Sequence, residues 1–411
     1  MPQPPVNTAR CTVCCSTALE AVVSFGKQPL STRFETAART RNAVQTCDLS
    51  LGYCTQCGAM QLVDRFPLMM LQTKFPAMRF REPQDHLPAV VAKLASLEGV
   101  DSNTRFLGLS YIDNDLLGLL AREVCENVSP VDYSSLPGWQ NDPGLETIQA
   151  LLTDPQSIGR IKAATGTVDV VSARFILEHA ESAIAFLESV AGLVRPGGYL
   201  VIEVPDAEKM LAAGNHALIW EDHFTYFTVN SLTDLVSRTD GTLVDIARYD
   251  YAYEDALVAI IRIGEGREVA AKNAAATFSA GVREKLAGFA EGFAARKRSL
   301  RIELQNLHAG GERLAVFGAG HHAAKYINFY GIEDLFDCVI DDNPAKAGLY
   351  MPGTGLCIRT SEYLMDSTVT TCLSTLSPEA EHRVRQSMAG FFERGGKFIP
   401  TFNFAGAHDD K

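Results

Sequence analysis

The sequence lacks the features of a membrane, secreted or nucleic-acid-binding protein. Among its 411 residues, no apolar run approaches the roughly 18 residues that a membrane-spanning helix needs. The first ten residues contain no apolar core of the kind found in signal peptides, so we expect a cytoplasmic protein without a membrane partner. The formal net charge of −12 argues against a nucleic-acid partner, because such proteins usually carry a basic face. Hydrophobic residues make up 46% of the chain and charged residues 21%, which excludes global disorder.

The cysteines are concentrated near the N-terminus. In a reducing compartment, the ten cysteines are not expected to form five disulfides. Two Cys-x-x-Cys pairs, Cys11 with Cys14 and Cys54 with Cys57, are separated by 39 residues. This arrangement is typical of four thiolates around a tetrahedral zinc, and four sulfur ligands leave no open position for chemistry. We therefore predict a structural zinc, the alternative being incidental buried or redox-active thiols.

The rest of the chain alternates between strand-like and helix-like segments, which predicts an α/β protein with mainly parallel, doubly wound sheets. The length suits two to four domains. We expect a zinc-binding module over 1–70, a first open sheet over 71–264, a helical connector over 265–308 and a second open sheet over 309–411. The expected strands of the first sheet are 105–109, 128–132, 167–172 and 198–203, closed by an antiparallel pair at 243–248 and 256–263. A helix is expected over 180–194, and apolar residues of the connector recur at helical spacing at Val282, Leu286, Phe289 and Phe293.

The two open sheets differ in the turn after their first strand. In the second sheet, Gly318-x-Gly320-x-x-Ala323 follows a strand and has the form of a dinucleotide-binding turn, with Asp341 about 20 residues on where a ribose-binding acid is expected. The alternative is a glycine turn that only packs a helix onto a sheet. In the first sheet, 109–115 contain no glycine, although Asp132 follows at the spacing of a ribose contact. Half of the nucleotide-binding pattern is therefore kept there.

Two histidines follow strands of the first sheet. His179 comes after the strand 167–172, and His223 comes after the strand 198–203, with Asp222 beside it. Because ligands of open α/β sheets bind at the carboxyl ends of the strands, both histidines are candidates for acid–base catalysis. The alternative for each is a helix cap or a buried histidine with satisfied hydrogen bonds.

Together, these features resemble the three-domain, zinc-containing sugar C-methyltransferases of deoxysugar biosynthesis, and the resemblance covers nearly the whole chain. It implies a Rossmann-like class I methyltransferase domain over 71–264 and a second Rossmann-like domain over 309–411. The matching segments are Cys11-Thr-Val-Cys14, Gln28-Pro-Leu-Ser31, Leu51-Gly-Tyr-Cys54-Thr-Gln-Cys57, Phe175-Ile-Leu-Glu-His179, Val194-Arg-Pro-Gly-Gly198, Glu203-Val-Pro205, Asp222-His-Phe-Thr-Tyr-Phe-Thr228, Asp341-Asp-Asn-Pro-Ala-Lys346 and Met351-Pro-Gly-Thr354.

The resemblance also implies a chemistry. Members of the family use S-adenosylmethionine (SAM) to methylate C3 of a thymidine-diphosphate-linked 4-keto-deoxysugar, after a base has removed the C3 proton. In this chain His223 matches the base and His179 matches a second active-site histidine, with Asp222 beside the base. The cofactor contacts would be Ser110, Asp113, Asp132 and Arg174, and the substrate contacts would be Tyr226, Gly318, Gly320 and Asp341.

The chain departs from the family pattern in three places. Ser110 replaces the glycine nearest to SAM, where its side chain is expected to crowd the methionine part of the cofactor. Phe75-Pro-Ala77 replaces Tyr-Pro-Tyr and lacks the phenol hydroxyls. Trp220-Glu-Asp-His223 replaces Tyr-His-Glu-His. Two alternatives to C-methyl transfer therefore stay open: an epimerase, isomerase or ketoreductase that acts on a nucleotide sugar without SAM, and a non-catalytic binding protein.

Overall fold

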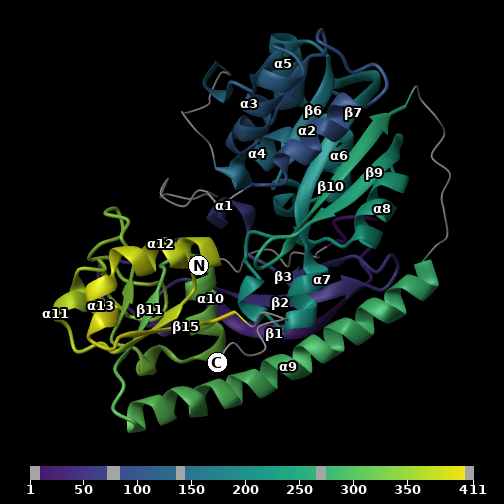
Figure 1. Ribbon diagram of the computed structural model, residues 1–411. Coiled ribbons are helices and arrows are strands. Elements are labelled where there is room, and N and C mark those ends of the chain that lie inside the picture. The colour runs from purple at the N-terminus through teal and green to yellow at the C-terminus, as the bar shows by residue number, and fades with distance from the viewer. Residues whose placement is uncertain (1–9, 72–83, 136–143, 265–274, 403–411) are drawn as a thin grey trace.

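The computed structural model describes residues 10–71, 84–135, 144–264 and 275–402, and these form three β-sheets and one long helix (Figure 1). Phe75 and Ala77 lie outside the described residues. The N-terminal sheet is antiparallel and receives its last strand from far along the chain, so it is joined directly to the next domain. Its order is β1 (Leu19–Pro29), β2 (Thr46–Cys54), β3 (Met60–Asp64) and β8 (Thr225–Tyr226), with α1 (Leu68–Leu71) after β3.

The second sheet has six strands, four of them parallel and two antiparallel at one edge, as the sequence predicts. The chain runs from β4 to β5 on one side and returns to β6 on the other, so the direction of winding changes beside β4. Ligands of doubly wound sheets bind at such a point. The strand order is β5 (Val128–Pro130), β4 (Phe106–Gly108), β6 (Val168–Arg174), β7 (Val194–Asp206), β10 (Asp255–Ile263) and β9 (Gly241–Tyr249).

Helices cover both faces of this sheet because its central strands are apolar on both sides. Val170 and Val201 belong to the core on one face, and Val171 and Leu200 belong to the core on the other. The helices are α2 (Leu87–Ala95), α3 (Asn114–Glu123), α4 (Leu145–Leu152), α5 (Pro155–Thr165), α6 (Ala183–Ala191) and α8 (Val229–Ser237). The helix after β7, α7 (Ala207–Ala213), instead belongs to the core of the N-terminal sheet.

The boundaries of α6 differ from the expected helix over 180–194. The helix begins later because the Ser182 side chain accepts a hydrogen bond from the Ala185 amide and caps its N-terminus. It ends at Gly192, and Val194 already belongs to β7. The residues before Ser182 instead form the short 3-10 helix η4 (Leu177–His179), which places His179 at the end of β6.

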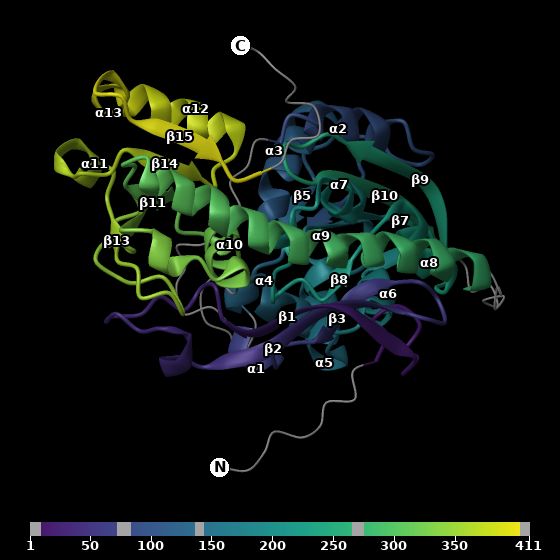
Figure 2. The same ribbon diagram turned by 90° about the horizontal axis from the view of Figure 1, so that it is seen from below.

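The long helix α9 (Ala275–Ala309) runs beneath the molecule and contacts β1, β2, α7 and α10 (His321–Tyr330) (Figures 1 and 2). Its apolar positions Val282, Leu286 and Phe289 are buried, which confirms the packing role that their spacing predicts. The Phe293 ring on the same helix lies edge-on against Phe25 of β1, with 5.0 Å between the centroids. The helix therefore braces the N-terminal sheet against the C-terminal domain.

The C-terminal domain is a five-stranded sheet in which every strand pair is parallel, in agreement with the predicted second open sheet. Its order is β13 (Ile358–Arg359), β12 (Cys338–Ile340), β11 (Leu314–Phe317), β14 (Thr371–Ser374) and β15 (Lys397–Pro400), with helices α10, α11 (Tyr363–Asp366), α12 (Pro378–Ser387) and α13 (Ala389–Glu393). Isolated bridges from Glu35 to Tyr350 and from Thr40 to Thr354 connect this domain to the N-terminal module. The N-terminal module is thus linked to the six-stranded sheet domain through β8 and to the C-terminal domain through these bridges.

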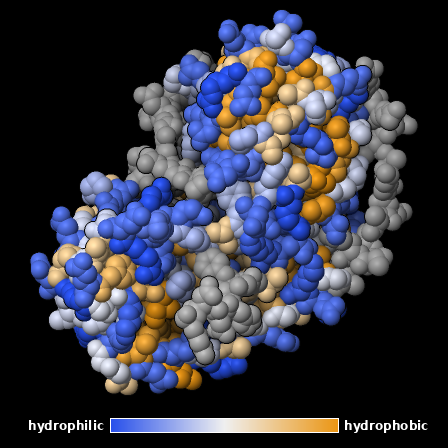
Figure 3. Space-filling model, in the orientation of Figure 1, coloured by the Kyte–Doolittle hydropathy of each residue, from blue (hydrophilic) through white to orange (hydrophobic). Residues whose placement is uncertain are grey.

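The surface is mostly hydrophilic on the face of Figure 1, where hydrophobic residues gather mainly over the six-stranded sheet and its helices (Figure 3). In the part of the chain that the structure describes, no helix combines the length and apolarity required to cross a membrane.

Candidate active site

The four predicted zinc ligands converge in one cluster. The Sγ atoms of Cys11 and Cys57 are 3.5 Å apart, those of Cys14 and Cys54 are 3.6 Å apart, and all four lie within 4.8 Å of one another. Zn–S bonds of about 2.3 Å in a tetrahedron place sulfurs about 3.8 Å apart, so the cluster fits zinc. Backbone turns with positive φ follow both pairs, at Cys15 (60°) and Gly58 (75°), and aim the thiolates inward.

The residues predicted to contact the cofactor lie at the carboxyl ends of neighbouring strands. The turn after β4, however, is filled by its own side chains. Asp113 is fully buried, and it accepts hydrogen bonds from the Ser110 amide (2.9 Å) and the Ser172 hydroxyl (2.6 Å). A Cβ on Gly108 would lie 2.7 Å from the Cβ of Asp113, so glycine at this position makes room for that carboxyl. Burial raises the pKa of Asp113 to about 6.

Arg174 holds this turn from the end of β6. Its buried guanidinium forms an ion pair with Glu203 and donates to the Ile112 carbonyl at 2.8 Å. Because those donor groups are engaged within the protein, the structure gives Arg174 a positioning role at the turn. The following residue, Phe175, has a φ of 49°, an uncommon conformation for a non-glycine residue that redirects the chain toward His179.

His179 and His223 are brought together, as both were expected at the carboxyl ends of strands. Their rings meet edge to face, with 4.7 Å between the centroids. The Phe224 amide donates to the Glu178 carbonyl at 2.7 Å, which ties the segment around His223 to η4. The hydroxyl of Tyr226 bonds both backbone groups of Trp220, so this predicted substrate contact is buried and supports the turn before His223.

Acidic residues that sequence reasoning missed surround the two histidines. Glu146 from α4 and Glu178 from η4 are buried beside Asp222, and Glu146 shares a group of possible ligand atoms with His179 and Asp222. No local pattern singles out Glu146, because it lies on an ordinary amphipathic helix that only the fold brings to the site.

Burial sets the protonation of this cluster. It lowers the pKa of His223 to about 3 and also lowers that of His179, so both imidazoles are neutral near pH 7. Burial, together with the charge of Asp222, raises the pKa of Glu146 to about 8. Burial also opposes ionisation of Asp222, but the facing His321, His179 and His223 lower its pKa. Asp222 is therefore the ionised carboxylate of the cluster.

The C-terminal domain contributes to the same site through α10. His321 lies 3.4 Å from Asp222, and Lys325, one turn further on, forms a buried ion pair of 2.6 Å with Glu221. The ring of His321 stacks on Trp220 at 4.9 Å. The two acids of the divergent Trp220-Glu-Asp-His223 segment are thus each matched by a basic residue of α10. Basic residues spaced by four directly after a glycine turn were the available signal in the sequence.

The predicted turn Gly318–Gly320 leads directly into that helix. Gly318 has a φ of +100°, and a Cβ there would lie 2.5 Å from the Thr375 hydroxyl, so glycine is required. A Cβ on Gly320 would meet nothing within 4 Å, which leaves space beside the N-terminus of α10. Asp341 accepts from the Ala319 amide at 2.8 Å and from Lys346 at 2.9 Å, and so clasps the turn.

Family models account for most of the chain. A zinc binding domain matches residues 11–69, a methyltransferase domain matches 89–246, and a C-methyltransferase C-terminal domain matches 267–402. The C-methyltransferase NovU of Streptomyces niveus is 25% identical over 412 residues, which cover 95% of this chain and 94% of the relative. The three models follow one another from residue 11 to residue 402, so the chain is similar over nearly its whole length to a three-domain C-methyltransferase.

Solved structures similar to this C-methyltransferase include two bacterial methyltransferases. The N-methyltransferase NodS of Bradyrhizobium japonicum WM9 is 16% identical, with 43% of this chain and 94% of that chain covered and a TM-score of 0.27. An O-methyltransferase family protein of Burkholderia thailandensis is 15% identical, with 44% of this chain and 57% of that chain covered and a TM-score of 0.29.

The edge of the six-stranded sheet offers one exposed carboxylate at the place where a ribose is expected. Asp132 is exposed just beyond β5, where a carboxylate would bind ribose hydroxyls. The Ser110 hydroxyl is engaged inside the turn, accepting from the Ile112 amide at 3.2 Å, and the extended φ of −142° imposes no strain on a serine. Asp132 Oδ1 already accepts from the amide and the hydroxyl of Ser134. SAM bound at this edge would meet Asp132 at its ribose and the rim of the 110–113 turn at its methionine part.

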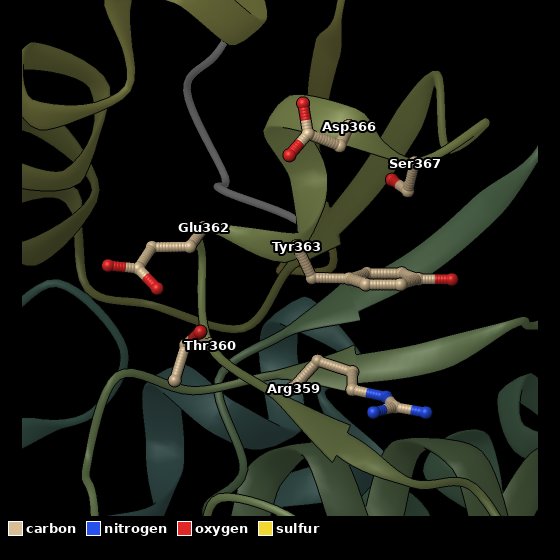
Figure 4. Close-up of a pocket in the computed structure, with 6 residues that line it drawn as sticks. All are labelled: Arg359, Thr360, Glu362, Tyr363, Asp366 and Ser367. Carbon is tan, nitrogen blue, oxygen red and sulfur yellow. The ribbon is translucent and has the colours of Figure 1, made fainter.

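A shallow hollow of about 400 Å³ lies elsewhere, at the far edge of the C-terminal sheet (Figure 4). The Arg359 guanidinium lies over the Tyr363 ring at 5.5 Å, and acidic side chains flank this pair. None of the predicted site residues lines this hollow, so it is separate from the candidate active site.

Proposed function

We propose that this SAM-dependent C-methyltransferase acts in the cytoplasm on a nucleotide-linked 4-keto-deoxysugar, with thymidine diphosphate as the nucleotide, and methylates its C3. The observation that carries the proposal is the position of α10. Its first turn follows the open Gly318–Gly320 turn, and its first residue, His321, reaches the Asp222–His223 segment. A diphosphate at the helix N-terminus would therefore place an attached sugar near the histidines.

The chain's own groups then perform the proton chemistry. A 4-keto group acidifies the proton on C3, and neutral His223 accepts that proton as general base, a contribution of about 10²–10⁴ in rate. His179 and Asp222 orient and balance the charge of the protonated base, and the enclosed site excludes water. Bound SAM supplies an electrophilic methyl group. The Asp132 carboxylate and the 110–113 turn would hold this donor and orient it toward the sugar.

The test is a direct assay of the purified protein with methyl-deuterated SAM and thymidine-diphosphate-linked 4-keto-6-deoxyglucose, read by mass spectrometry. We expect a sugar product that has gained one deuterated methyl group at C3, and we expect His223→Gln to abolish it. His382→Gln, which changes an exposed histidine of α12, is the matched control and keeps the activity. Turnover by His223→Gln at the wild-type rate would refute the role of the base.

The 110–113 turn supports a second candidate function, which is exchange or epimerisation at C3 without methyl transfer. Its support is that the Asp113 and Arg174 side chains fill the interior of the turn. The same substrate in D2O without SAM distinguishes the two reactions. Exchange at C3 accompanied by a change in configuration, and no methylated product after SAM is added, supports the second candidate and contradicts the first.

A further inference from the structure

A line of ionisable side chains connects the base to the C-terminal domain. His179 and His223 belong to one group whose reactive atoms lie within 4.8 Å of one another, and His179 and Asp222 belong to a second such group. Asp222 in turn lies 3.4 Å from Nε2 of His321. The four side chains therefore form a continuous path from the base to α10.

Two polar atoms at the centre of the path make no hydrogen bond. Nδ1 of His179 and Oδ1 of Asp222 are buried and have no hydrogen-bond partner, although buried polar atoms are normally paired. Both residues are more than nine-tenths buried. These two atoms are available to pass a proton between neighbours, whereas the remaining oxygen of Asp222 faces His321.

The path also changes from buried to accessible along its length. His223 and His179 retain only 6% and 5% of their exposure, whereas 16% of the His321 side chain is exposed. The neighbouring pair of Lys325 and Glu221 is different, since both side chains are almost completely buried and Glu221 also accepts from Ser31. The ion pair between Lys325 and Glu221 holds α10 in place, whereas the side chain of His321 is partly exposed to solvent.

We propose that His321 is the outlet for the proton that His223 removes from the substrate. In this step the C3–H bond breaks and its electron pair would form the bond to the methyl group of SAM, while the methyl–sulfur bond breaks and its electron pair stays on the sulfur. The proton passes from His223 by way of His179 and Asp222 to the His321 imidazole, and then to water. Methyl transfer from a sulfonium releases one proton per turnover, and a base enclosed by protein needs such a route before the next cycle.

The inference rests on the proposed function, and it makes His321 a positioning and relay residue that acts through Asp222. The other ionisable groups facing the path are Glu146 from α4, Glu178 from η4, and Glu221 with its partner Lys325. None of these reaches solvent, because each is buried. His321 is thus the accessible end among these residues.

The test compares His321→Gln and His321→Ala with the wild type and with His382→Gln, using the nucleotide 4-keto sugar and SAM. We expect kcat to fall about 10- to 100-fold in both His321 variants, with KM for the sugar changed less than about threefold. Added imidazole should restore turnover in His321→Ala, and hydrogen–deuterium exchange at C3 should slow in parallel. His382→Gln should match the wild type throughout.

Different failures give different results. Wild-type kcat in His321→Gln overturns the outlet and leaves the proposed function intact. A loss of kcat accompanied by a proportional rise in KM, without rescue by imidazole, also overturns it, because that result describes lost binding. Wild-type protein that neither methylates nor exchanges C3 overturns the proposed function and the outlet with it. Variants whose melting temperatures are close to that of the wild type, and well above the assay temperature, are folded.

Discussion

Two turns of this chain, one after β4 and one after β11, follow the first strand of their open sheets, but they are built in different ways. The turn at 318–320 depends on backbone freedom, with Gly318 at positive φ and open space over Gly320. The turn at 110–113 depends on side chains, with Asp113 inside and Arg174 across it. One topology thus builds either a turn with open space beside a helix N-terminus or a turn that its own side chains fill.

We expect the largest loss of stability from removing Arg174, which holds the first turn through its side chain. Arg174→Met should lower the free energy of unfolding by about 3–5 kcal/mol, because it leaves Glu203 buried with less compensation. Lys346→Met removes the corresponding clamp of the second turn and should cost only about 1–2 kcal/mol, since its pair with Asp341 is less buried. Denaturant unfolding measures both, and equal losses would remove the distinction.

Gly318 is the next most sensitive position. Gly318→Val should cost about 2–4 kcal/mol, because a side chain must adopt positive φ and displace Thr375. Ser110→Val at the matching position of the first turn should cost about 1–2 kcal/mol, because its backbone is already extended and only the cap is lost. Thermal unfolding followed by circular dichroism compares the pair, and a larger loss for Ser110→Val would reverse the comparison.

The histidines that lie between the turns give a pH-dependent test. Burial lowers the pKa of His223 to about 3, so between pH 6.5 and 3 the unfolded chain binds a proton that the folded chain does not. The stability of the wild type therefore falls as the pH falls through this window. His223→Gln should recover about 3 kcal/mol at pH 4.5 relative to pH 7.5. His382→Gln should leave the slope unchanged, and an unchanged slope in His223→Gln would show that burial does not hold this imidazole neutral.

Gly320 should affect binding more than stability. Gly320→Ala should keep the free energy of unfolding within about 0.5 kcal/mol, since a Cβ there meets no atom within 4 Å. It should weaken binding of thymidine diphosphate about tenfold, because the methyl occupies the space of the phosphate. Gly288→Ala on α9 is the control and should leave the affinity unchanged. Titration calorimetry decides, and unaltered affinity in Gly320→Ala would place the nucleotide elsewhere.

Local spacing predicted the zinc cluster and much of the sheet architecture. Two residues between Cys11 and Cys14 and again between Cys54 and Cys57 are enough to form two turns, and hydrophobic runs at regular intervals predict buried parallel strands. His179 and His223 were also predictable, because both follow strands whose carboxyl ends share one edge. The exact start of α6 was not, since a single capping serine moved it.

The order of the amino acids is enough to give four thiolates in two pairs, a glycine turn before α10 and a serine turn after β4. Which distant groups meet depends on how the domains pack. Glu221 and Lys325 stabilise one another only because α10 packs against the 220–223 segment, and His321 reaches Asp222 for the same reason. Burial then set the charges, because a carboxyl or an imidazole removed from water changes its pKa according to neighbours that are far away in the chain.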